Sequence, residues 1–102
     1  MHLIQILLPH YDNTGQRFSA TIYRSLEATL AERFGGVTFY SRSAAEGTWR
    51  DRHGSQHRDD IVVVEVMVET LDREWWRAFT QGLKASFRQQ ELVVRASAIE
   101  LL

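Results

Sequence analysis

The sequence contains no cysteine, a single proline and six glycines among its 102 residues. Without cysteine, neither a disulfide nor a thiolate ligand for zinc or an iron–sulfur cluster can form, so any metal would have to be held by histidine or carboxylate groups. A cysteine-free chain is typical of a reducing compartment, and we expect a cytoplasmic protein.

A charge excess and long apolar runs are also missing. The 12 Lys and Arg residues nearly balance the 13 Asp and Glu residues, which leaves a formal charge of -1. General nucleic-acid binding usually depends on an excess of positive charge. No apolar run approaches the roughly 20 residues of a membrane-spanning helix, and the N-terminal stretch lacks the basic lead and cleavage site of a signal peptide. We therefore expect neither nucleic acid nor a membrane as a partner.

Six segments show regular spacing of apolar residues. Alternation or a continuous short apolar run predicts a strand, and apolar residues that recur every three to four positions predict a helix. In chain order we expect a strand at 3–8, a helix at 16–34, a strand at 37–42, a strand at 60–70, a helix at 72–90 and a strand at 91–102.

Several local signals define the ends of these segments. Gly35 and Gly36 end the first helix, because glycine accepts the left-handed cap conformation. Asp72 is a good N-cap for the second helix. Gly82, in the middle of that helix, suggests a close approach of a neighbouring backbone. Residues 43–59 contain Trp49 and a turn signal near Gly54, and we expect an extended hairpin arm there.

The order of elements predicts one α+β domain over residues 1–102, with the ferredoxin-like βαββαβ arrangement. Right-handed crossovers place both helices on one face of a four-stranded antiparallel sheet, with the first and third strands in its centre. The central strands should be the most apolar, as residues 3–8 and 60–70 are.

The second face of this sheet is the informative one. The helices should cover the side that bears the even-numbered residues of the two central strands. The reverse side carries Leu3, Gln5, Leu7, Tyr40, Arg42, Val63, Glu65, Met67, Glu69, Val93, Arg95 and Ile99. A contiguous apolar area of this kind is uncommon on a soluble monomer, so we expect a second copy to cover it in a homodimer with two-fold symmetry. The alternative is a solvated face, as in many antiparallel sheets.

In its order of elements the chain resembles the dimeric α+β barrel superfamily, which includes small cofactor-free monooxygenases and muconolactone-isomerase-like enzymes. In amino-acid sequence, the chain resembles small bacterial proteins described only as hypothetical. The segments that carry this resemblance are LLPHYDN, ERFGGVTFYSR, AEGTW and DDIVVVEVMVETLD. The first resemblance implies a dimer in which two sheets face each other, with the hairpin arm reaching across the partner. The second implies no function.

Glu65 is the main candidate for chemistry, because it should lie in the middle of the sheet. A buried carboxylate needs a partner, and Arg42 or Arg95 on other strands could supply it. One interpretation is an ion pair that fixes the dimer register. In the other, Glu65 is a proton acceptor or ligand anchor in a cleft where Tyr40 and Arg42 bind a polar group. Trp49, unexpected in a polar hairpin, is expected to be an anchor for the partner subunit, and the alternative is that it forms part of a ligand wall.

The candidate pocket or interface set is Gln5, Tyr40, Arg42, Trp49, Glu65, Met67 and Arg95. His53 and His57 are four residues apart, but a hairpin does not place them as a helix would, and we predict no metal site. The sequence has no phosphate-binding loop, dinucleotide fingerprint or serine nucleophile elbow, and we predict no cofactor.

Two functions from different classes remain open. The preferred one is a non-catalytic homodimeric domain that binds a partner or a small ligand. The alternative is a cofactor-free small-molecule enzyme of the monooxygenase or isomerase kind, with Tyr40, Arg42, Glu65 and Arg95 around a pocket between the two sheets. A cavity beside Glu65 would favour the enzyme, and a filled interior with Glu65 paired to arginine would favour assembly.

Overall fold

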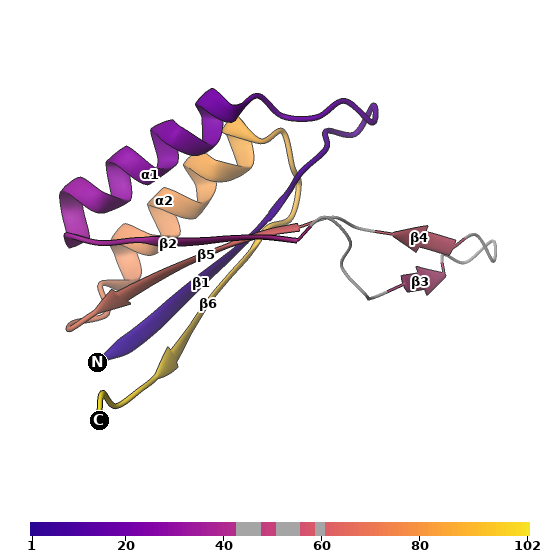
Figure 1. The fold of residues 1–102 in the computed structure, drawn as a ribbon. Coiled ribbons are helices and arrows are strands. Elements are labelled where there is room, and N and C mark those ends of the chain that lie inside the picture. Colours follow the sequence, from indigo (N-terminus) through magenta and orange to yellow (C-terminus); the bar gives the residue numbers. More distant parts are fainter. Residues whose placement is uncertain (43–47, 51–55, 59–60) are drawn as a thin grey trace.

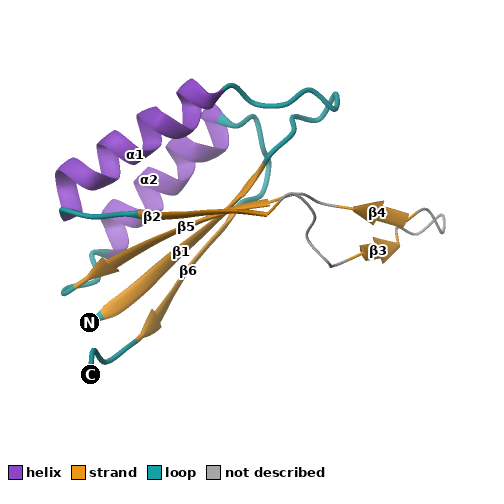
Figure 2. Ribbon diagram, viewed as in Figure 1, coloured by secondary structure: helices purple, strands orange, loops and turns teal. Residues whose placement is uncertain are grey.

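The computed structural model describes residues 1–42, 48–50, 56–58 and 61–102. Its four main strands form one open antiparallel sheet with two helices, which confirms the predicted ferredoxin-like α+β fold (Figures 1 and 2). The elements in chain order are β1 (His2–Pro9), α1 (Ala20–Phe34), β2 (Thr38–Arg42), β3 (Thr48–Arg50), β4 (Gln56–Arg58), β5 (Ile61–Val68), α2 (Arg73–Ser86) and β6 (Val93–Ala98).

The main sheet has the order β2-β5-β1-β6, so β1 and β5 are central, as predicted. All three pairs of strands are antiparallel. Ile6 pairs with Val64 on one side and with Val94 on the other. Because side chains alternate along a strand, this register places these three residues on the same face of the sheet.

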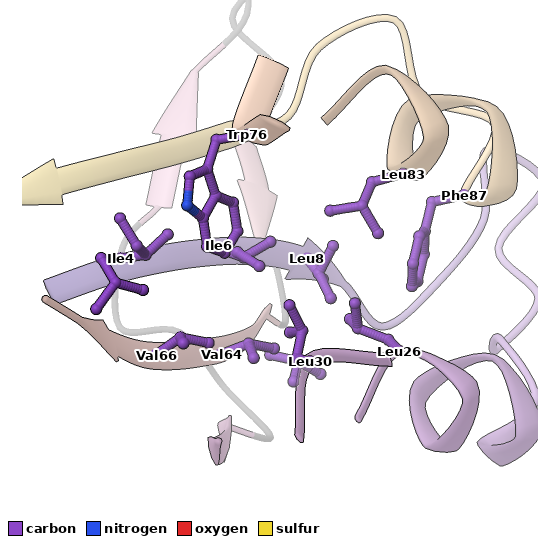
Figure 3. Close-up of a cluster of buried hydrophobic side chains, with 12 residues drawn as sticks. Ile4, Ile6, Leu8, Leu26, Leu30, Val64, Val66, Trp76, Leu83 and Phe87 are labelled. Carbon is purple, nitrogen blue, oxygen red and sulfur yellow. The ribbon is translucent and has the colours of Figure 1, made fainter. Parts of the chain in front are cut away.

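The core lies between the sheet and the helices, which cover one face together (Figures 1 and 3). Ile6, Leu30 and Val64 are completely buried at its centre. The even-numbered residues of β1 and β5 that were expected beneath the helices belong to this cluster. Its members are Ile4, Ile6, Leu8, Leu26, Leu30, Val62, Val64, Val66, Val68, Trp76, Leu83 and Phe87.

Helix α1 begins at Ala20, four residues later than the predicted start. The preceding segment closes on itself instead, because a carboxylate oxygen of Asp12 accepts hydrogen bonds from the N–H groups of Thr14 and Gln16 and from the Thr14 hydroxyl. These bonds hold the pKa of Asp12 below its usual value, the Thr14 hydroxyl having the largest effect. Short polar side chains that bond to nearby backbone compete with helix formation in this way.

Helix α2 begins as predicted, since the Asp72 side chain accepts a hydrogen bond of 3.1 Å from the N–H of Trp75. The helix ends at Ser86, before the predicted end near residue 90, and Arg88 beyond it has a positive φ of 52°. The expectation for Gly82 was wrong. A Cβ added there would meet no atom within 4 Å, so the glycine borders open space rather than a close backbone contact.

Strands β3 and β4 form a separate two-stranded sheet, in which Trp49 pairs with His57 (Figure 1). They fall within the segment expected to form a hairpin arm. The predicted turn near Gly54 and the side chain of Trp49 lie outside the described residues, so the arm and its contact with a partner stay predictions.

The face of the main sheet opposite the helices, called the open face below, carries exposed apolar side chains. Tyr40, Met67 and Val93 are 49%, 53% and 51% exposed. Within the described part of the chain, neither helix lies on this face (Figure 1). The apolar patch expected from the alternation of residues is therefore present, and what covers it is a separate question.

Candidate functional site

A hydrogen-bonded row of polar side chains crosses the middle of the open face. Gln5 on β1 lies opposite Glu65 on β5 and opposite Arg95 on β6. The Gln5 amide donates a hydrogen bond of 2.7 Å to Glu65 Oε2, and Arg95 Nε donates one of 2.9 Å to Gln5 Oε1. Gln5 thus connects the acid on one neighbouring strand to the base on the other, and its amide orientation is fixed at both ends.

This row refines the expectation that an arginine neutralises Glu65. Among the described side chains, Arg95 is linked to Glu65 through Gln5 rather than directly. On the other side, Thr38 is the residue of β2 opposite Glu65, while Arg42 lies opposite Ile61, four positions further along. Four strand residues span about 13 Å. The side chain of Arg42 lies outside the described residues.

An open recess of about 580 Å³ lies on the open face beside Glu65. It is formed where the end of α1 meets the start of β2 and the neighbouring strands. Its lining residues are Leu3, Phe34, Gly35, Gly36, Val37, Thr38, Tyr40, Glu65 and Met67.

Three of the predicted candidate residues line this recess together. Glu65 contributes a half-buried carboxylate, Tyr40 a ring with a hydroxyl group, and Met67 a flexible thioether. Thioether and aromatic groups give an adaptable apolar surface for a small ligand, and a few convergent polar groups fix its orientation. The recess therefore combines the two kinds of surface found in binding sites for small molecules.

The charge of the recess is negative. Besides Glu65, its wall includes Gly35 and Gly36, at the C-terminal end of α1, where the helix dipole has its negative end. Gly35 has a φ of 79° and donates its N–H to the carbonyl oxygen of Ala31, at 2.8 Å. Arg33 in the same last turn is turned to the ring of Trp75, 4.3 Å from its centroid. A cationic group is thus favoured over an anionic one beside Glu65.

Sequence reasoning missed Thr38, Gly35 and Gly36 as lining residues. Thr38 could have been found, because it alternates with Tyr40 on the open face. The two glycines were interpreted only as the end of a helix, and nothing in the sequence indicates that their backbone borders a recess. Trp49 was assigned to the same set of candidates, but its strand β3 belongs to the separate sheet.

A second recess, of about 400 Å³, lies between α2 and β6 at the edge of the sheet. Arg73, Arg77 and Arg95 border it together with Trp76. It contains no acidic side chain, so its charge is opposite to that of the recess beside Glu65. Arginines on a helix surface are usually solvated, and we assign no ligand to this recess.

Polar groups also meet at the end of β1. His10 is buried, and the hydroxyl of Tyr23 donates a hydrogen bond of 2.5 Å to the carbonyl oxygen of Pro9. Burial raises the pKa of Tyr23 above its usual value of 10.0, and the charge of Arg17 opposes this shift. The hydrogen bond ties α1 to the end of the central strand and has a structural role.

Among the described residues, no three His, Asp or Glu side chains lie close enough together to hold a metal ion. No helix in that part of the chain is long and apolar enough to cross a membrane. The cytoplasmic location and the bacterial origin stay predictions.

Comparison with known proteins supports the fold. No family model matches the chain, and no curated protein matches it in sequence. A phage SAM lyase solved in complex with S-methyl-5'-thioadenosine aligns with a TM-score of 0.61 and 15% identity, covering 94% of this chain and 79% of that one. A phage SAM lyase in the apo state aligns with a TM-score of 0.64 and 14% identity, covering 94% and 78%. The chain thus shares its small antiparallel α+β fold with these lyases, whereas the dimeric barrel superfamily has no direct match.

Proposed function

We propose that this protein binds a small cationic ligand in the recess beside Glu65, and that S-adenosylmethionine (SAM), a sulfonium compound, represents the ligand class. The observation that carries this proposal is the combination of a carboxylate, a helix C-terminus and an apolar wall in one recess. A sulfonium is a positive charge that donates no strong hydrogen bond, and a carboxylate beside apolar groups suits it.

The lining residues offer the ligand different kinds of contact. Tyr40 presents a ring on which a nucleobase can stack, and such stacking contributes about 1–3 kcal/mol. Leu3 and Met67 provide apolar contact, and Thr38 adds a hydroxyl group beside Glu65. The resemblance to phage SAM lyases supports this ligand class, since one of them was solved with S-methyl-5'-thioadenosine.

Binding of SAM and of S-methyl-5'-thioadenosine to the same protein variants, measured by calorimetry, tests the proposal. The first ligand carries the sulfonium and the second is neutral at sulfur. Glu65→Gln should weaken binding of SAM about tenfold, equivalent to 1.4 kcal/mol, and binding of the neutral thioether by less than about threefold.

Two matched controls make this test specific. Glu69→Gln removes the same charge from an exposed position outside the recess, and it should leave both affinities unchanged. Tyr40→Leu should weaken the binding of both ligands to the same extent. Tyr11→Leu, which alters another exposed tyrosine, should weaken the binding of neither. If Glu65→Gln lowered the affinity for both ligands equally, Glu65 would not be the residue that binds the positive charge of the sulfonium.

Turnover of the sulfonium is a second candidate function, favoured by the shared fold of the lyases over 94% of the chain. The bond between sulfur and the amino-acid chain would break with its electron pair remaining on sulfur, which yields neutral S-methyl-5'-thioadenosine. Glu65 would accept a proton from the carbon next to the one that leaves sulfur, and the electron pair of that C–H bond would form a C=C bond, so that the amino-acid part leaves as vinylglycine. This proposal replaces the monooxygenase or isomerase chemistry implied by the resemblance to dimeric barrels.

Chromatography of reaction mixtures tests for turnover. The wild-type protein should release S-methyl-5'-thioadenosine from SAM faster than a protein-free sample, which measures spontaneous breakdown. Glu65→Gln should return the rate to that background. Binding without release would leave the protein as a non-catalytic receptor, the function preferred from the sequence.

We also propose that a second copy of this chain covers part of the open face in a homodimer. The exposed Met67 and Val93 support this proposal, since clustered apolar side chains of this size mark interaction sites. Light scattering should then report twice the chain mass of 11.8 kDa. A particle of the chain mass at high micromolar concentration would contradict the dimer but not the ligand site.

A further inference from the structure

On the open face, a negative side chain lies on one side of strand β1 and a positive side chain lies on the other. Gln5 lies on β1 itself, with Glu65 one strand away on β5 and Arg95 one strand away on β6, in the same row. Adjacent strands are about 4.8 Å apart, so the negative and positive groups lie at similar distances on opposite sides of β1. The two hydrogen bonds of Gln5 hold both side chains in this row.

The rows on both sides of this polar row are mainly apolar. In one of them, Leu7 lies between Val63 and Val93. In the other, Leu3 lies between Met67 and Ser97. A second sheet packed on this face must therefore place apolar rows on apolar rows and the polar row on the polar row, since an unpaired buried charge is costly.

We propose that two copies pack their open faces together about a two-fold axis parallel to β1, so that Arg95 of each copy pairs with Glu65 of the other. Rotation about this axis keeps the position along the strand and exchanges the two sides of β1. Each Glu65 then faces the partner's Arg95, and Leu7 faces the partner's Leu7. Packed sheets lie about 10 Å apart, a distance that an arginine and a glutamate extended towards each other can bridge.

The alternative face-to-face axis, perpendicular to the strands, conflicts with the charges. It would place Glu65 against the partner's Glu65 and Arg95 against the partner's Arg95. Juxtaposed like charges cost several kcal/mol at an interface, whereas opposite charges fix its register. Charge complementarity therefore selects the axis parallel to β1.

This packing leaves one side of the ligand recess open and gives the other side a wall from the partner. Strand β6 is an edge strand, so the partner's sheet ends above β5 and does not extend over β2. The recess is lined by Leu3 of β1, by Glu65 and Met67 of β5, by the end of α1 and by the start of β2, so the partner covers its inner side and leaves the β2 side open. The partner's Arg95 then lies at its inner side, where it shares Glu65 with the cationic group of a ligand and can bind a carboxylate of the same ligand. The pairing rests on the homodimer proposed above, and this last step rests also on the proposed ligand.

Charge reversal tests the pairing without any ligand. Glu65→Arg and Arg95→Glu should each turn two attractions of the dimer into two repulsions and weaken self-association at least about 100-fold in sedimentation velocity. An equimolar mixture of the two variants should form a heterodimer, because each variant supplies the charge that the other needs. The double variant Glu65→Arg/Arg95→Glu should dimerise like the wild type.

The controls separate the possible outcomes. Arg77→Glu makes the same charge change on α2, away from the open face, and should not alter association. Circular dichroism should show all variants folded. If the single variants dimerise as the wild type does, or if their mixture stays monomeric, the proposed pairing is wrong. A mixture that associates more tightly than the wild type would indicate the perpendicular axis. If the single variants associate as the wild type does while the wild type binds SAM, this inference alone is refuted.

Discussion

The neighbouring residues Ile6 and Leu7 of β1 point to opposite faces of the sheet, and their replacement by alanine should have very different effects. Ile6 is completely buried beneath the helices. Ile6→Ala removes three carbon atoms, which at about 0.8 kcal/mol each lose roughly 2.4 kcal/mol of transfer free energy. The cavity left in the core adds to this loss, so the free energy of unfolding should fall by about 3–4 kcal/mol.

Leu7→Ala is the matched control, because it removes the same number of carbon atoms one position further along. Leu7 is only half-buried on the open face, so its replacement should cost the monomer about 1–2 kcal/mol. If a second copy covers that face, the rest of the effect should appear as weaker association, measured by sedimentation.

Urea denaturation followed by circular dichroism, at protein concentrations too low for association, measures both costs. Ile6→Ala should lower the urea midpoint by at least twice as much as Leu7→Ala. Since small domains have a free energy of unfolding of about 5–15 kcal/mol, the Ile6 variant should remain folded but be clearly less stable. Equal shifts of the urea midpoint for the two variants would refute the conclusion that this sheet has one buried and one solvent-exposed face.

Three further substitutions test local features. Asp72→Ala should lower stability by about 1 kcal/mol in urea denaturation, because the N–H of Trp75 loses its cap, and Asp72→Ser should recover most of this loss. Tyr23→Phe should cost about 1 kcal/mol at neutral pH through its lost hydrogen bond. Because burial raises the pKa of Tyr23, its contribution is complete below pH 10.0 and falls as pH rises through the raised pKa, so Tyr23→Phe should flatten the alkaline decline of the melting temperature. Gly35→Ala should cost about 1–2 kcal/mol in the same assays, because φ at Gly35 is 79°, whereas Gly36→Ala, at a position without positive φ, should be nearly neutral.

The sheet and its two faces could be predicted from the sequence because alternation and sheet order follow from strong local signals. Four of the five valines of β5, namely Val62, Val64, Val66 and Val68, lie on alternate positions, and the register places them beneath the helices, as expected. The start of α1 could not be predicted, because Asp12 forms a local turn that the helical spacing of later residues does not reveal. The effect of Gly82 also depends on distances between elements, which periodicity does not contain.

The candidate site was predictable in part. Gln5, Glu65 and Arg95 could be assigned to one face from alternation alone, but their connection through Gln5 depends on which residues pair across three strands. A shift of two residues in either register would have separated them while leaving every residue on the same face. The recess depends on Gly35, whose role beyond ending a helix follows only from the path of the chain.

The position of β1 in the centre of the sheet also has a consequence for how the chain folds. This first strand pairs with β5, about 60 residues later, and with β6, about 90 residues later. Pairings so distant in sequence require large loops to close, which slows folding relative to proteins dominated by local contacts. A nascent chain that has not yet released β6 from the ribosome keeps one side of β1 without its strand partner. This sheet can therefore close only after β6 has been synthesised and released, and its exposed edge is a natural substrate for chaperones until then.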